Sequence, residues 1–216
     1  MVITNYQKQF LKYNFTSMDQ KDIPEIIIRL QNADSELREK LISEGKLGEG
    51  YHQEMENLHN KNAEVLDQII DIIGFPTVEK VGNESAYCTW LVIQHSIGKP
   101  EFMKKCAKLL DIEIKNKKAD PRNLAYLTDR IAAFENKPQL YGTQFDWDEN
   151  GELSSNHLDD INKVNKRRKS IGLNTLEEQT EIIRIQAKNE NHLPPKDLVQ
   201  RKTEMENWKK SVGWIK

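Results

Sequence analysis

The sequence predicts a mostly α fold, and three observations support this prediction. Apolar residues recur at spacings of three and four over several long stretches, which is the pattern of a helix with one buried face. Proline often stands in the first turn of such a stretch, and glycine often follows its end. A strand-like pattern is confined to residues 138–153. We therefore expect a single-domain, bundle-like array of about seven or eight helices, with one short β-hairpin or irregular loop near residues 138–153.

The first two expected helices cover residues 23–41 and 51–73. The first has Pro24 in its first turn, and Gly45 follows its end. The second ends before Gly74 and carries one buried stripe, formed by Met55, Leu58, Asn62, Val65, Ile69 and Ile72.

Two further helices are expected at residues 83–97 and 100–114. Asn83 can cap the first of them, whose sequence AYCTWLVIQHSI is apolar almost all round and is therefore expected to be central and buried. Pro100 begins the second.

The rest of the chain is expected to fold around a hairpin. Asp120 and Pro121 begin a helix that ends near Asn136, and two short extended runs flank a turn at Asn150 and Gly151. Further helices are expected at about 157–170, 175–190 and 195–211. We expect Asn174 to cap the second of these, with Glu177 three residues on. The expected domain is residues 1–216, with a core at about 22–172 and a helical extension at about 173–216.

The composition of the chain indicates where in the cell it is expected. The chain is 37% hydrophobic and 31% charged, and its longest uninterrupted apolar run, residues 90–93, is far too short to span a bilayer. The N-terminal residues lack the apolar segment of a secretory signal. Cys88 and Cys106 form no disulfide framework and no CxxC pair. We therefore expect a cytoplasmic protein with no membrane partner.

The charge pattern gives no reason to expect a nucleic-acid partner. The net charge is -2, and the basic run at residues 166–169 is short and lacks interleaved aromatic residues. A solvated helix face explains this run better. The C-terminal helices could instead contact a protein partner.

Several polar side chains occupy helical positions where apolar residues are expected. His59 and Asn62 share one face of the second helix, and His95 follows Leu91 and Val92 by one turn. A buried polar group without a partner costs about 1 to 3 kcal/mol. We therefore expect these groups to pair with one another or with a ligand, either as core residues or as parts of a site.

Asp129 is a candidate acid of the same kind. It lies between Ala125 and Ala132 on the fifth expected helix, so it could orient His95 or His59, act as a base, or form a structural ion pair. Arg130 points about 100° away around the helix. Its guanidinium could bind an anionic group of a substrate or hold a loop carbonyl.

The loop after this helix contains many hydrogen-bonding groups. Gly142 would allow close approach of its backbone, and its polar side chains are candidates for substrate binding: Gln139, Tyr141, Thr143 and Gln144. The alternative is that the loop folds back and satisfies its own backbone.

No sequence motif indicates a cofactor. The chain has no Walker loop, Rossmann glycine pattern, HExxH or GxSxG, so we expect no organic cofactor and favour proton-transfer chemistry over redox chemistry. A two-histidine, one-carboxylate metal site formed by His59, His95 and Asp129 is an open alternative.

A series of short motifs resembles an uncharacterised bacterial family, a domain of unknown function. The motifs are HNKN at 59–62, GFPT at 74–77, WLVIQHS at 90–96, AYLTDR at 125–130, KPQLYGTQF at 137–145 and RRKSIGLNTL at 167–176. The resemblance covers about residues 59–176, and it implies that the site candidates named above belong to the family pattern. Phe75 stands where the family more often has tryptophan. The first helix and the last 40 residues lie outside the resemblance.

These observations lead to one principal hypothesis and two alternatives. We expect an enzyme of the hydrolase or group-transfer type that acts on a small polar molecule or a peptide side chain, with His95, Asp129 and His59 as catalytic residues. The first alternative is a non-catalytic binding or protein-interaction module. The second is a metal-dependent enzyme that uses the two-histidine, one-carboxylate site.

Overall fold

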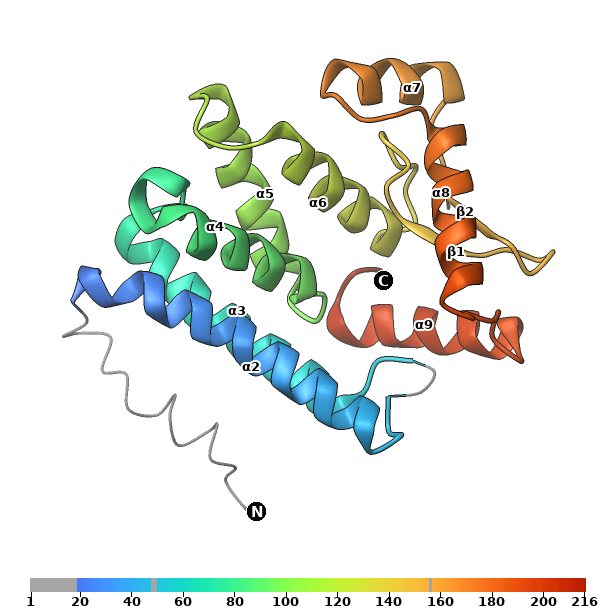
Figure 1. Ribbon diagram of the computed structural model, residues 1–216, viewed down its shortest axis with the longest axis horizontal. Coiled ribbons are helices and arrows are strands. Elements are labelled where there is room, and N and C mark those ends of the chain that lie inside the picture. The colour runs from blue at the N-terminus through green and yellow to red at the C-terminus, as the bar shows by residue number, and fades with distance from the viewer. Residues whose placement is uncertain (1–18, 48–49, 156) are drawn as a thin grey trace. The chain divides into compact units, whose positions relative to one another are not determined.

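The computed structural model describes residues 19–47, 50–155 and 157–216 (Figure 1). This part of the chain contains eight α-helices and one two-stranded antiparallel sheet, so the prediction of a mostly α fold is confirmed. The chain divides into two compact units, residues 1–102 and residues 103–216, and each is described by itself.

The first unit is built from three long helices. They are α2 (Ile23–Ser43), α3 (Gln53–Ile73) and α4 (Val78–His95), and a short 3-10 turn (Gln20–Asp22) precedes α2. Helix α2 packs against both α3 and α4, and α3 also packs against α4. The core between them contains aliphatic side chains that are almost wholly buried: Ile27, Leu30, Leu41, Leu66, Ile69 and Ile93. Burying each such side chain contributes about 1.5 to 3 kcal/mol.

The buried face of α3 differs slightly from the predicted stripe. Ile72, which we expected in the core, is 42% exposed, whereas Leu66 and Ile70 are buried. The buried face of α3 is centred closer to Leu66 and Ile70 than the predicted stripe, so Ile72 lies at the edge of that face. Asn62 and His59 both lie on the buried face, as their spacing predicted.

Helix α4 is longer at its start and shorter at its end than predicted. Its backbone leaves the helical region at Gly82, where φ is 80° and ψ is 168°, and the predicted segment from Asn83 is the part that follows this break. The helix ends at His95 instead of residue 97. Tyr87 is exposed, so α4 has a solvent face that its apolar sequence did not predict.

The second unit contains the remaining helices, with the boundary between the units falling inside α5. The helices are α5 (Pro100–Lys115), α6 (Pro121–Phe134), α7 (Ile161–Ser170), α8 (Leu176–Asn189) and α9 (Leu198–Val212). Asp120 caps α6 as expected, accepting a hydrogen bond from the amide of Arg122 at 2.8 Å. The cap of α8 is Thr175, which forms a capping box with Glu178. The predicted pair of Asn174 and Glu177 was therefore one residue early.

A short hairpin lies between α6 and α7, as predicted. Strands β1 (Phe145–Trp147) and β2 (Leu153–Ser155) are antiparallel, with Asp146 opposite Ser154. In the turn, the carboxylate of Asp148 accepts hydrogen bonds from the amides of Asn150 and Glu152 at 2.9 and 3.0 Å. Gly151 has a φ of 70°, which favours glycine there.

The C-terminal residues pack onto the end of α6. The ring of Trp214 stacks on that of Phe134, with centroids 5.2 Å apart. The ammonium group of Lys209 donates hydrogen bonds to Asn136 Oδ1 at 2.7 Å and to the carbonyl of Ala133 at 3.3 Å. No helix among the described residues is long and apolar enough to cross a membrane.

Candidate functional site

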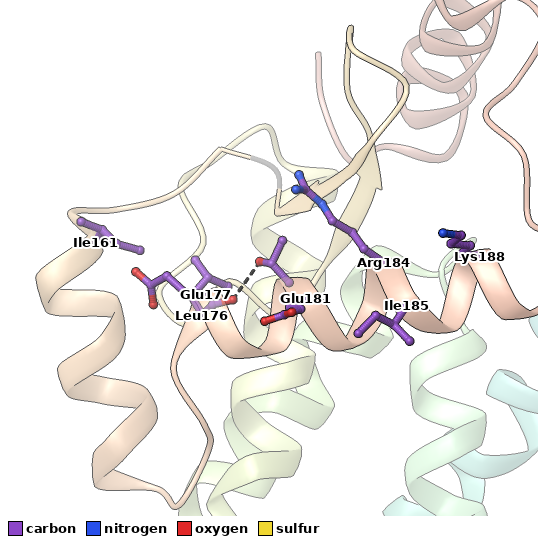
Figure 2. A pocket seen from close by; sticks show the side chains of 8 residues that line it. Ile161, Leu176, Glu177, Glu181, Arg184, Ile185 and Lys188 are labelled. Atoms are coloured by element: carbon purple, nitrogen blue, oxygen red, sulfur yellow. Dashed lines mark hydrogen bonds between the residues drawn. The ribbon is translucent and has the colours of Figure 1, made fainter.

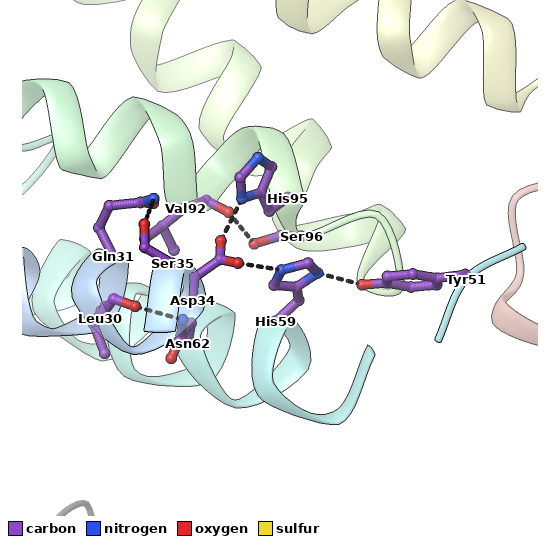
Figure 3. A network of polar contacts seen from close by, with 10 residues as sticks. All are labelled: Leu30, Gln31, Asp34, Ser35, Tyr51, His59, Asn62, Val92, His95 and Ser96. Carbon is purple, nitrogen blue, oxygen red and sulfur yellow. Dashed lines mark hydrogen bonds and ion pairs between the residues drawn. The ribbon is translucent and has the colours of Figure 1, made fainter. Parts of the chain in front are cut away.

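The polar centre of the first unit is the carboxylate of Asp34, which lies between two imidazoles (Figure 3). Asp34 Oδ1 is 3.1 Å from Nε2 of His59, and Oδ2 is 2.5 Å from Nδ1 of His95. The two rings are 5.2 Å apart between centroids. Helices α2, α3 and α4 contribute one residue each, so the packing of these three helices assembles the cluster.

Helical periodicity explains why Asp34 points inward. It follows Leu30 by four residues and Ile27 by seven, on the face of α2 that packs into the core. A charged group in this position is costly unless it is hydrogen-bonded, and the two imidazoles supply those bonds. Asp34 is therefore held by the same packing that buries the aliphatic side chains around it.

The environment of Asp34 keeps its carboxyl group ionised. Burial by itself would raise the pKa of Asp34, but the hydrogen bonds and the charges of His59 and His95 outweigh burial and hold that pKa well below its ordinary value. An ionised carboxylate can only accept hydrogen bonds. The nitrogen atoms that face it, Nε2 of His59 and Nδ1 of His95, must therefore carry hydrogen.

Tyr51 extends the cluster on the side of His59. Its hydroxyl oxygen is 2.6 Å from Nδ1 of His59, and the two rings stack with centroids 5.7 Å apart. Burial, followed by the negative charges of Glu56 and Asp34, raises the pKa of Tyr51, so the phenol stays protonated. Both nitrogen atoms of His59 thus have partners within the protein.

His95 differs from His59 in its access to solvent. Its side chain is 37% exposed, whereas that of His59 is 9% exposed. Among the described residues, none makes a hydrogen bond with Nε2 of His95. A neutral His95 that donates from Nδ1 has its lone pair on Nε2, so this ring presents a base at the edge of the cluster.

Asn62 forms a hydrogen bond between α3 and α2 next to the cluster. Its amide nitrogen donates a hydrogen bond of 2.9 Å to the carbonyl of Leu30, one turn before Asp34. Its amide oxygen is buried and has no hydrogen-bond partner among the described residues. Asn62 therefore ties α3 to α2 next to the carboxylate and contacts neither imidazole by a hydrogen bond.

The second unit holds the other predicted acid, Asp129, in a different role. Its carboxylate accepts hydrogen bonds from the backbone amides of Leu140, Tyr141 and Thr143 at 2.8 to 3.2 Å. Burial raises the pKa of Asp129, and these amides oppose the rise without cancelling it. Asp129 therefore organises the loop that follows α6, and the acid that contacts His95 is Asp34.

The other predicted binding residues stabilise the same loop. The side chain of Gln139 pairs with the backbone of Gln144 through two hydrogen bonds of 2.9 and 3.0 Å. Gln144 in turn accepts from Nε of Arg130 at 3.0 Å and donates to Thr143 Oγ1 at 3.0 Å. These contacts match the alternative in which the loop folds back on itself.

A buried arginine completes this loop network. The guanidinium of Arg168 donates to the carbonyls of Tyr141 and Asn174 at 2.8 and 2.6 Å. Gly142 lies at the centre with a φ of 63°, and a Cβ atom there would lie 2.9 Å from Leu176 Cδ1. The sequence did not predict a role for Arg168, because a basic residue within the run 166–169 looks like part of a solvated face.

A surface hollow in the second unit runs along α8 (Figure 2). None of the predicted site residues lines it; its lining residues are Ile161, Leu176, Glu177, Thr180, Glu181, Arg184, Ile185 and Lys188. Its charged groups all come from α8, where the acidic residues Glu177 and Glu181 precede the basic residues Arg184 and Lys188. The hollow therefore lacks the convergent polar groups that mark a reactive site.

Asp34 and Tyr51 are also site residues that were not predicted from the sequence. Asp34 sits in the buried stripe of α2, where Ile27 and Leu30 precede it at helical spacing. Like Asn62 and Asp129, Asp34 is a polar residue at a helical position next to apolar or small residues, so the same pattern indicates its burial. Tyr51 precedes α3 and has no periodic signal, so only the structure reveals its contact with His59.

Comparisons with known proteins identify the family of this chain. A family model described as a family of unknown function (DUF6624) matches residues 21–189. No curated protein and no solved structure matches the chain. The matched residues include α2 and α8, which the resemblance in the sequence had left out, so Asp34 lies within the family region.

Proposed function

The chain belongs to the DUF6624 family, whose function is unknown, and we propose that it is an enzyme of the hydrolase or group-transfer type with His95 as its general base. One observation carries this proposal. The carboxylate of Asp34 faces Nδ1 of His95, while Nε2 lies on the opposite side of the ring in a side chain that is 37% exposed (Figure 3). An acid that orients an imidazole in this way fixes the tautomer in which the outer nitrogen can take a proton.

The proposed step is proton transfer from a water molecule or from a hydroxyl group of a second substrate. As the oxygen attacks an electrophilic carbon of the substrate, its proton moves to Nε2 of His95, and Asp34 stabilises the resulting imidazolium. The same proton then passes to the leaving group, which restores neutral His95. Attack by water gives hydrolysis, and attack by a hydroxyl group gives transfer.

His59 and Tyr51 act as positioning residues in this scheme. Both nitrogen atoms of His59 are engaged, one by Asp34 and one by Tyr51, and the ring is nearly buried. His59 therefore holds Asp34 in place but does not meet the substrate. The exposed edge of His95 favours a substrate that is a small polar molecule or a peptide side chain.

The test is hydrolysis of a panel of nitrophenyl esters and amino-acid anilides by the parent, by His95→Gln and by His192→Gln. His192 is an exposed histidine outside the cluster. We expect turnover by the parent and by His192→Gln, and a loss of at least about 100-fold in His95→Gln, since general-base catalysis is worth about 10² to 10⁴. Equal turnover in all three proteins would contradict the proposal. A loss of helical circular dichroism in His95→Gln would favour a structural network and the non-catalytic alternative.

We also propose a cytoplasmic location in a bacterial cell. Cys88 and Cys106 are both buried thiols outside any disulfide, which fits a reducing compartment. The resemblance to a bacterial family supports the source. Separation of cell fractions, with detection of the protein by antibody, tests this location.

A further inference from the structure

The Asp34 cluster also has the composition of a metal site. Asp34, His59 and His95 each offer one ligand atom, a carboxylate oxygen or an imidazole nitrogen, and these atoms all lie within 4.8 Å of one another. Two imidazoles and one carboxylate are ligands that zinc and neighbouring divalent transition metals accept. The metal alternative from the sequence had Asp129 as its acid, whereas in the structure the acid beside the two histidines is Asp34.

The positions of the three ligand atoms suit one ion. Metal–nitrogen and metal–oxygen bonds to zinc are about 2.0 to 2.2 Å long, which places the ligand atoms of a tetrahedral ion about 3.3 to 3.6 Å apart. An ion therefore requires Asp34 and His95 to move slightly apart from their 2.5 Å contact, so that it replaces the hydrogen between them. Each ligand comes from a different helix, and the helices pack against one another. Three protein ligands would leave one coordination position open, on the side where His95 reaches solvent.

Tyr51 provides a second, independent feature of a metal site. Metal-binding histidines usually form a hydrogen bond through the nitrogen that does not bind the ion. The hydroxyl of Tyr51, 2.6 Å from Nδ1 of His59, takes this role. With an ion on Nε2, the ring proton moves to Nδ1 and is donated to the phenol oxygen, which can accept as well as donate.

We infer that Asp34, His59 and His95 bind one divalent transition-metal ion of the zinc class. Binding does not depend on the proposed function. An ion bound to Nδ1 of His95 leaves the ring proton on Nε2. His95 therefore cannot bind the ion and act as the general base of the proposed function at the same time. The ion would bring a bound water molecule of lowered pKa in place of that base.

The experiment is isothermal titration calorimetry, in which zinc chloride is added to the full protein after a chelator has removed any bound metal. We expect one ion per chain for the parent and for His192→Gln, which removes an exposed histidine outside the cluster. In Asp34→Asn and His95→Gln the affinity should fall by at least about 100-fold, and in Tyr51→Phe by about 10-fold. Titration with cobalt chloride should give the visible spectrum of a nitrogen–oxygen site in the parent, and this spectrum should be absent from His95→Gln.

Two results would overturn the inference. One is the absence of stoichiometric zinc binding by the parent. The other is unchanged affinity in both Asp34→Asn and His95→Gln, each with helical circular dichroism like the parent, which would assign the ion to another place. His95 lies at the exposed edge of the cluster, so we expect His95→Gln to fold even if Asp34→Asn does not. The zinc affinity of His95→Gln then decides the test. Whether or not zinc binds, turnover by the metal-free protein that is lost in His95→Gln would support the proposed function.

Discussion

Asp34 Oδ2 lies 2.5 Å from Nδ1 of His95, although the two residues are 61 positions apart in the chain. The contact joins the middle of α2 to the last residue of α4. It explains how a buried carboxylate is stabilised and why Nε2 of the half-buried His95 is left without a hydrogen bond to the described residues.

Replacing Asp34 by asparagine should destabilise the first unit. The amide offers one acceptor where the carboxylate offers two, and its NH₂ group faces the N–H of one imidazole. Breaking a buried pair of this kind costs about 3 to 5 kcal/mol. Urea unfolding of metal-free Asp34→Asn against the parent measures this cost. A difference below about 0.5 kcal/mol, the usual range for a surface substitution, would contradict the assigned contacts.

The contribution of Asp34 to stability should depend on pH. Because its pKa in the folded protein is lowered from the ordinary value of 3.8, the contribution is present above that value and is lost as the pH falls through the folded pKa. In metal-free protein, the difference in unfolding free energy between the parent and Asp34→Asn should therefore shrink as the pH falls below about pH 4. A difference that grows as the pH falls from about pH 4 to about pH 2 would have the wrong sign.

Replacing Gly142 by alanine should destabilise the second unit. The new Cβ atom would lie 2.9 Å from Leu176 Cδ1 and 3.0 Å from Leu158 Cδ2, at a φ of 63°. Gly172→Ala is the matched control, because its φ is 74° and a Cβ atom there meets nothing within 4 Å. We expect thermal unfolding to show a loss of about 1 to 3 kcal/mol for Gly142→Ala beyond that of the control. Equal losses would show that the loop does not need the close approach.

Replacing Asp129 by asparagine should release the loop after α6. Three backbone amides would compete for one remaining acceptor, at a cost of about 1 to 3 kcal/mol. Hydrogen exchange at Leu140, Tyr141 and Thr143 should accelerate. Because the proposed base is oriented by Asp34, turnover per folded molecule should stay within about threefold of the parent. A loss as large as that of His95→Gln would return Asp129 to the catalytic role first expected from the sequence.

Much of the helical framework was predictable from the sequence, because periodicity and end signals are local. Pro24, Asp120 and the Asn150–Gly151 turn each marked the start of an element or a reversal that the structure confirms. Boundaries were less accurate where two signals were adjacent, as at Asn174 and Thr175, since either side chain can cap a helix.

The site was predictable only in part, because pairing between helices is not a local property. Polar residues in apolar stripes correctly pointed to buried positions for His59, Asn62 and Asp129. The pattern did not reveal which acid meets which imidazole. Asp129 finds its partners within 14 residues, in its own loop, whereas Asp34 finds them 25 and 61 residues away. Periodicity describes one helix at a time, so it could not distinguish these two cases.

The most direct test of the account is the tautomer of His95 in metal-free protein at neutral pH. Long-range proton–nitrogen NMR of the ¹⁵N-labelled parent, with His95→Gln to assign the signal, distinguishes the two ring nitrogens. We predict hydrogen on Nδ1 and a lone pair on Nε2, as donation to Asp34 requires. A neutral ring with its hydrogen on Nε2 would contradict the account.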